Sequence, residues 1–116
     1  MDQKMKEFTL NDKVALVTGA IGLIGREVTD ALGSAGCDLI LLDILPQEEI
    51  DIYAKLLSKK HTITVKGFRA NIIDVDTISI ILDQAVELFG KIDILINLAA
   101  IDAKFDTNIE KGNNTS

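Results

Sequence analysis

The segment from Val14 to Val28, VALVTGAIGLIGREV, constrains the fold of this chain more than any other stretch. With the preceding Lys13, its first part reads KVALVT and predicts a short strand, because strands buried on both faces are continuously apolar. Apolar residues then recur at helical spacing from Leu23 to Ala35, which predicts an amphipathic helix. Three glycines join the two patterns, so the segment predicts a strand, a tight turn and a helix.

The alternation of strand and helix patterns continues along the chain. We expect further strands at 37–43, 62–67 and 92–98, and further helices at 46–60 and 74–89. The inner faces of these two helices are expected to hold Ile50, Tyr53, Ala54 and Leu57 in the first, and Val75, Ile78, Leu82, Ala85 and Phe89 in the second. The order βαβαβαβ predicts an α/β fold, a Rossmann-type doubly wound parallel sheet with strand order 3-2-1-4.

The glycine spacing has a physical meaning at a turn from strand to helix. Gly19 permits the tight turn, Gly22 removes a side chain where a pyrophosphate approaches backbone N–H groups, and Gly25 lets the helix pack closely on the sheet. The helix N-terminus then offers free N–H groups and its positive dipole end to phosphates. The alternative is that these glycines only punctuate a loop. The strand before them and the helix after them favour a dinucleotide site.

A carboxylate at the end of the second expected strand supports the same hypothesis. Asp43 stands where an acidic residue binds the ribose hydroxyls of a dinucleotide. A carboxylate there repels a 2′-phosphate, and no Arg or Lys follows within three residues, so NAD(H) is favoured over NADP(H). The alternative is that Asp43 only caps the turn that follows it.

Length and charge limit the organisation and the partners of the chain. A length of 116 residues predicts one domain, and the strand and helix patterns place it at 13–100. An arm at 1–12 precedes the domain. A polar C-terminal loop at 101–116 follows it, and we expect this loop to be cut off before the next element. A net charge of −6 argues against nucleic acid and against an anionic membrane surface. The N-terminal segment lacks the apolar run of a secretory signal, and no apolar run is long enough for a membrane span.

The few cysteine and histidine residues predict no further chemistry. Cys37 is the single cysteine, which fits a reducing compartment, and we expect a small core residue in a cytoplasmic protein. His61 is the single histidine and is expected to be solvated at a polar helix end. No Cys/His cluster has the spacing of a metal site, so no metal is expected.

Three segments together resemble the short-chain dehydrogenase/reductase family. TGAIGLIG at 18–25 is similar to its cofactor loop, ANIID at 70–74 to the segment along the adenine ring, and FGKIDILINLAA at 89–100 to the stretch that leads into its Asn-Asn-Ala-Gly motif. The resemblance implies NAD-binding roles for Gly19, Gly22, Leu23 and Ile24 through backbone groups, for Gly25 in helix packing, for Asp43 and Ile44 at the adenosine ribose, for Asn71 and Ile72 at the adenine, and for Asn97 and Ala99 beside the cofactor.

The sequence departs from the family pattern in two ways. The spacing Gly-x-x-Gly-x-x-Gly and the ending LAA resemble the extended branch, which includes sugar-nucleotide epimerases, whereas FGKIDILIN resembles the classical branch. The family also implies a catalytic Tyr with a Lys four residues later. The single tyrosine, Tyr53, is followed at that spacing by Leu57, so we assign no catalytic residue and expect this chain alone to be inactive.

Three functions stay open at this point. In the first, the chain is the NAD-binding part of an oxidoreductase that takes a small carbonyl, alcohol or sugar substrate when the rest of the fold is present, and it resembles the sugar- and flagellin-modification oxidoreductases. In the second, it is a stand-alone, non-catalytic nucleotide-binding module. In the third, it is a fragment of a sugar-nucleotide epimerase or dehydratase. For a chain that ends at Ser116, the apolar strand at 92–98 would be an exposed edge, so we expect self-association unless the tail or another chain covers it.

Overall fold

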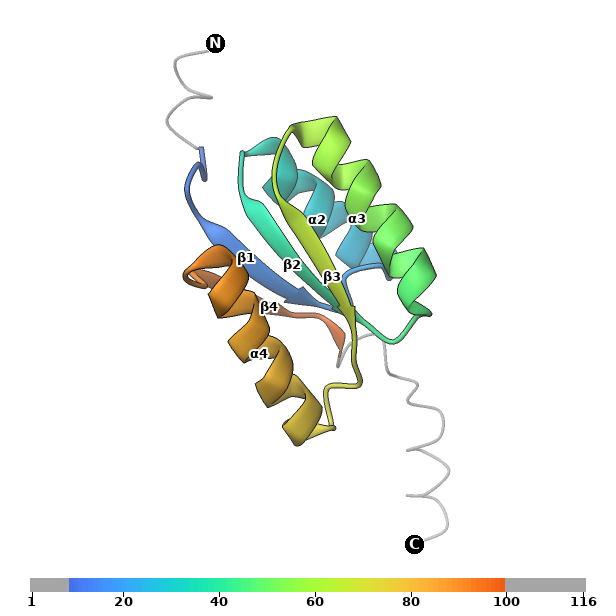
Figure 1. Ribbon diagram of the computed structural model, residues 1–116. Coiled ribbons are helices and arrows are strands. Elements are labelled where there is room, and N and C mark those ends of the chain that lie inside the picture. The colour runs from blue at the N-terminus through green and yellow to red at the C-terminus, as the bar shows by residue number, and fades with distance from the viewer. Residues whose placement is uncertain (1–8, 100–116) are drawn as a thin grey trace, which may run out of the picture.

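A computed structural model describes residues 9–99 of the chain (Figure 1). The elements are β1 Val14–Thr18, α2 Leu23–Ser34, β2 Asp38–Asp43, α3 Gln47–His61, β3 Val65–Arg69, α4 Val75–Phe89 and β4 Ile94–Asn97. The expected C-terminal loop at 101–116 and residues 1–8 of the expected arm lie outside the described residues.

The strands form one parallel sheet in the order β3-β2-β1-β4. Figure 1 shows α2 and α3 on one face of this sheet and α4 on the other. Both the predicted strand order and the predicted layering are therefore confirmed. In this order β1 lies between β2 and β4, so the loop after β1 is flanked by the ends of two neighbouring strands.

The two central strands divide their side chains between two cores. On one face, Ala15 and Val17 of β1 pack in a cluster with the inner residues of α3, which are the predicted Ile50, Tyr53, Ala54 and Leu57. On the other face, Val14 and Leu16 pack in a cluster with Ile81 and Ala85 of α4. Every residue of β1 is buried, as expected for a strand that is covered on both faces.

The third strand begins later than predicted. We expected it at 62–67, but the structure has β3 at Val65–Arg69. Thr62 instead ends α3 in the left-handed conformation, with φ 56°, and its N–H donates to the carbonyl of Ser58. The helix termination overrides the strand propensity of this β-branched residue.

The buried faces of two helices also differ from the predicted ones. On α4, Val75 is 73% exposed and Leu82 is 36% exposed, whereas Ile81 is 6% exposed and belongs to the core. On α2, the apolar Leu23 and Ile24 are exposed, and the buried residues are Gly25, Thr29 and Gly33. An apolar period alone does not reveal that a helix approaches the sheet through its small residues, because those residues carry little of the hydrophobic signal.

His61 is not solvated, contrary to the prediction. Its side chain is only 10% exposed, and its Nε2 lies 2.7 Å from Oδ1 of Asp30 on α2. Lys60 donates to the same oxygen at 3.0 Å. A Cβ on Gly33 would come within 2.6 Å of the His61 ring, so the ring fills the space that this glycine leaves. The hydrogen bonds to Asp30 and the packing of the His61 ring on Gly33 thus hold the C-terminal end of α3 against α2.

This contact gives a pH dependence with a defined sign. Hydrogen bonds from His61 and Lys60 lower the pKa of Asp30 below its ordinary value. The stabilisation is present above the unfolded-state pKa of about 4 and is lost as the pH falls through the lower, folded-state pKa. We therefore expect Asp30→Asn to be less stable than the wild type above about pH 4, and the difference in their free energies of unfolding to shrink as the pH falls below that value.

Urea unfolding across this pH range measures the difference. Asp83→Asn, on an exposed part of α4, is the control and should show no such convergence. A difference between wild type and Asp30→Asn that persists unchanged at the lowest pH would contradict the assignment.

Candidate cofactor-binding site

The carboxyl ends of the four parallel strands lie along one edge of the sheet. They end at Thr18, Asp43, Arg69 and Asn97. All the site residues predicted from the sequence follow or form these ends: Gly19, Gly22, Leu23, Ile24 and Gly25 after β1, Asp43 and Ile44 at β2, Asn71 and Ile72 after β3, and Asn97 and Ala99 at β4. In open parallel sheets, this edge is where ligands bind.

The glycine loop begins with a turn that needs Gly19. This residue has φ 67°, a backbone conformation that side chains with a Cβ rarely adopt. The N–H groups of Gly19 and Ala20 both donate to the carbonyl of Leu42 on β2, at 2.9 and 3.2 Å. The turn is thus fixed to the neighbouring strand before the chain reaches α2.

Gly25 sets the distance between α2 and the loop. A Cβ built on Gly25 would lie 2.0 Å from the carbonyl oxygen of Gly19 and 2.6 Å from the carbonyl carbon of Ala20. Both atoms belong to the backbone, so no side-chain rotation could relieve the overlap. Gly25 therefore allows the close approach of α2 to the turn after β1, and its role at a cofactor site stays a prediction.

The N-terminus of α2 has exposed apolar side chains and no capping side chain. Its N-cap residue is Gly22, no side chain among the described residues caps it, and the first turn has no acidic residue. The first N–H groups of a helix have no partners within the helix, and they carry its positive dipole end. Leu23 is 88% exposed and Ile24 is 46% exposed at this turn. This arrangement suits an anionic group of a ligand.

Asp43 connects the end of β2 to the glycine loop. Its Oδ2 accepts from the N–H of Ile21 at 2.9 Å, and its Oδ1 accepts from the N–H groups of Ile44 and Leu45 at 2.8 and 3.2 Å. The carboxylate therefore does cap the following turn, but it holds the glycine loop as well. A carboxylate accepts about four hydrogen bonds, so about one position is left for a ribose hydroxyl.

The end of β4 is attached to β1 through a hydroxyl that the sequence analysis did not single out. Thr18 Oγ1 donates to Oδ1 of Asn97 at 2.5 Å and accepts from the N–H of Ala99 at 3.2 Å. Parallel pairing brings Thr18 opposite Asn97. A threonine as the last residue before a glycine turn is the signal that was available for this contact.

Arg26 is the second residue that the sequence analysis missed. Its Nε donates to the carbonyl of Ile21 at 3.0 Å, so a side chain of α2 returns to the glycine loop. Asn71, in contrast, makes a contact within its own turn, where its Oδ1 accepts from the N–H of Ile73 at 3.2 Å. The predicted position beside an adenine stays a prediction for Asn71 and Ile72.

The described residues contain no second centre of chemistry of the kinds considered from the sequence. Burial raises the pKa of the Cys37 thiol to about 11, and the side chain is fully buried, as predicted for a core residue. Within residues 9–99, no three His, Cys, Asp or Glu residues are grouped as metal ligands would be. None of the helices described is both long enough and apolar enough to cross a bilayer.

The chain matches the family model of the short chain dehydrogenases over residues 13–115. It belongs to this family. The predicted resemblance is thereby confirmed, over nearly all of the sequence.

Curated relatives agree with this assignment. The chain is 35% identical to 2-dehydro-3-deoxy-D-gluconate 5-dehydrogenase of Escherichia coli over 103 residues, which are 88% of this chain and 39% of the relative. It is 32% identical to a sorbose reductase of Candida albicans over 94 residues, which are 81% of this chain and 33% of that protein. The chain thus spans little more than a third of the relatives it matches. Neither relative is an epimerase or dehydratase, so they give that alternative no support.

Solved structures show the same fold. NAD⁺-bound xylitol dehydrogenase matches 73% of this chain and 32% of its own, with a TM-score of 0.67 and 30% identity. An L-sorbose reductase from Gluconobacter frateurii, in complex with NADPH and L-sorbose, matches 76% of this chain and 33% of its own, with a TM-score of 0.70 and 20% identity. Proteins of this fold therefore include complexes with either nicotinamide cofactor.

The close approach of α2 gives a direct test of the loop geometry. We expect Gly25→Ala to lower the free energy of unfolding by about 1–3 kcal/mol, because the added methyl group overlaps fixed backbone atoms. Ser34→Ala, at the exposed end of the same helix, should change it by less than about 0.5 kcal/mol. Urea unfolding measures both variants, and equal stability of the Gly25 variant and wild type would refute the close contact.

Proposed function

We propose that this chain is the NAD(H)-binding part of a short-chain oxidoreductase. The observation that carries the proposal is the pairing of an uncapped α2 N-terminus with the Asp43 carboxylate at the end of the adjacent strand. The N–H groups of the first turn would bind the pyrophosphate, and Asp43 would accept from an adenosine ribose hydroxyl. Bound NAD supplies a hydride acceptor, and NADH a hydride donor.

The charges at this edge support NAD over NADP. In this proposal Asp43 would stand where NADP carries its 2′-phosphate, and the two like charges would repel each other. The nearest basic residue by strand pairing is Arg69, which lies opposite Asp43. Its Nε donates to the carbonyl of Ile44 at 3.1 Å, so this side chain supports the loop that follows Asp43.

The substrate class and the other partners belong to the same proposal. Relatives named for sugar acids and sugars support a small carbonyl, alcohol or sugar substrate, held by residues beyond the described part of the chain.

Self-association is supported by exposed apolar side chains of α4 and β4, which include Ile80, Leu88 and Leu95. A single free cysteine, Cys37, supports a cytoplasmic location.

Calorimetric titration of the 116-residue chain with each cofactor tests the proposal. We expect NADH to bind, and to bind more tightly than NADPH. Asp43→Asn should weaken NADH binding about tenfold or more, because a hydrogen bond to a charged acceptor is lost, and should narrow the difference between the cofactors.

Asp38→Asn is the matched control, because this carboxylate stands at the opposite end of the same strand and accepts from the N–H of Thr64 at 2.9 Å. Its NADH affinity should equal that of the wild type. Equal affinity of the wild type for NADH and NADPH would refute the preference, and no binding of either would refute the proposed function.

A further inference from the structure

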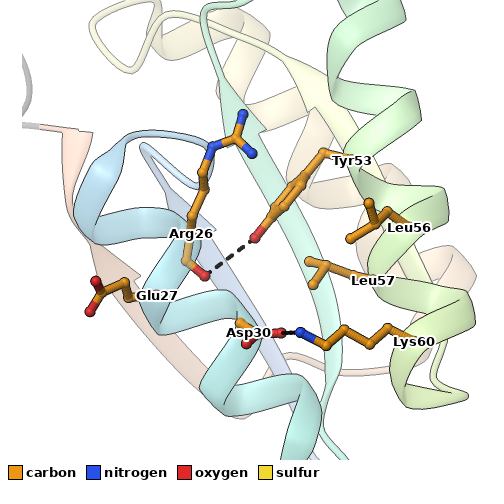
Figure 2. Close-up of a pocket in the computed structure, with 7 residues that line it drawn as sticks. All are labelled: Arg26, Glu27, Asp30, Tyr53, Leu56, Leu57 and Lys60. Carbon is orange, nitrogen blue, oxygen red and sulfur yellow. Dashed lines mark hydrogen bonds and ion pairs between the residues drawn. The ribbon is translucent and has the colours of Figure 1, made fainter.

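A shallow groove between α2 and α3 contains side chains that extend to the glycine loop (Figure 2). Its cavity volume is about 260 Å³, and the residues that line it are Arg26, Glu27, Asp30, Tyr53, Leu56, Leu57 and Lys60. Figure 2 shows the Arg26 side chain rising beside the Tyr53 ring, and the Tyr53 hydroxyl directed at the backbone of α2. These two residues connect α3 with the first turn of α2.

The Arg26 side chain is held at two places. Its Nε donates to the carbonyl of Ile21 at 3.0 Å, and its guanidinium carbon lies 4.9 Å from the centre of the Tyr53 ring. A planar guanidinium stacks on an aromatic ring and donates at the same time, which an ammonium group does less well. The ring therefore fixes the side chain that holds the loop.

The Tyr53 hydroxyl continues the same network inside the protein. The Tyr53 hydroxyl lies 2.7 Å from Thr29 Oγ1 and 3.3 Å from the carbonyl oxygen of Arg26. Thr29 Oγ1 in turn donates to the carbonyl of Gly25 at 2.8 Å. Thr29 is fully buried and Tyr53 is 8% exposed, so water does not replace these bonds readily. They fix two carbonyl groups of the first turn of α2 in place.

Both sides of the loop residue Ile21 are consequently fixed. Its N–H donates to Asp43 and its carbonyl accepts from Arg26. The N–H of Gly22 donates to the carbonyl of Gly19 at 3.3 Å, so the N–H groups that would meet the pyrophosphate are those of Leu23, Ile24 and Gly25. A binding site whose backbone is already ordered loses less conformational entropy when the ligand binds.

We infer that Arg26 and Tyr53 are positioning residues for the pyrophosphate-binding backbone. The inference rests on the proposed NAD(H) site. Neither side chain needs to touch the cofactor, because each acts through the peptide groups of the loop and of the first turn.

Two conservative variants test the inference in the full 116-residue chain. Tyr53→Phe keeps the ring and removes the hydroxyl, and Arg26→Lys keeps the positive charge and removes the Nε–H donor. We expect each to weaken NADH binding by about three- to tenfold, the range for loss of one hydrogen bond. Adenosine, which has no pyrophosphate, should bind each variant as it binds the wild type. Calorimetry measures NADH, and an NMR titration measures adenosine.

Lys60→Met is the matched control, since Lys60 lines the same groove and pairs with Asp30 but makes no contact with the loop among the hydrogen bonds described. Both of its affinities should equal those of the wild type. Unchanged NADH affinity in both test variants, even with a lower melting temperature, would show a merely structural role and overturn the inference. An equal loss for adenosine and NADH would overturn it as well. If the wild type binds no NADH, the proposed function fails first, and the inference fails with it.

Discussion

The backbone of α2 lies directly against the backbone of the turn that follows β1, and the position of the helix N-terminus at the carboxyl edge of the sheet depends on this contact. Only a residue without a Cβ fits at position 25, because the carbonyl of Gly19 occupies the space. The contact brings the free N–H groups of the helix close to the ends of β1 and β2. A helix held farther from the sheet would present the same groups to open solvent.

Strand order then decides which side chains meet the loop. Because β2 pairs with β1 in parallel, the Asp43 carboxylate lies beside the glycine loop and accepts from Ile21. Because β4 pairs with the other side of β1, Asn97 meets the hydroxyl of Thr18. The loop is thus bounded by an acidic group on one side and a polar amide on the other. One parallel topology accounts for both neighbours.

Much of this arrangement could be predicted from the sequence, because its signals are local. The glycine spacing, the apolar strands and Asp43 at a strand end each depend on a few adjacent residues, and the predicted sheet order followed from the handedness of the crossovers. The inner face of α3 could also be predicted, because Ile50, Tyr53, Ala54 and Leu57 recur at helical spacing, and all four are buried.

The rest depends on contacts between segments that are distant in sequence. The His61 ring is covered because α2 offers Gly33 and Asp30, and no pattern around residue 61 indicates this. Arg26 and Tyr53 meet only once α2 and α3 lie side by side. The exposed Leu23 and Ile24 resemble core residues in the sequence, because apolar spacing does not show which face of a helix is turned away from the sheet.

The most direct test of the NAD(H) site is an NMR titration of the ¹⁵N-labelled chain with NADH. We expect the largest amide shifts at Gly22, Leu23, Ile24 and Gly25, together with Ile44 beside Asp43, and small shifts along α4. Largest shifts on α4, or no shifts at the carboxyl edge of the sheet, would contradict the assignment of this edge as the cofactor site.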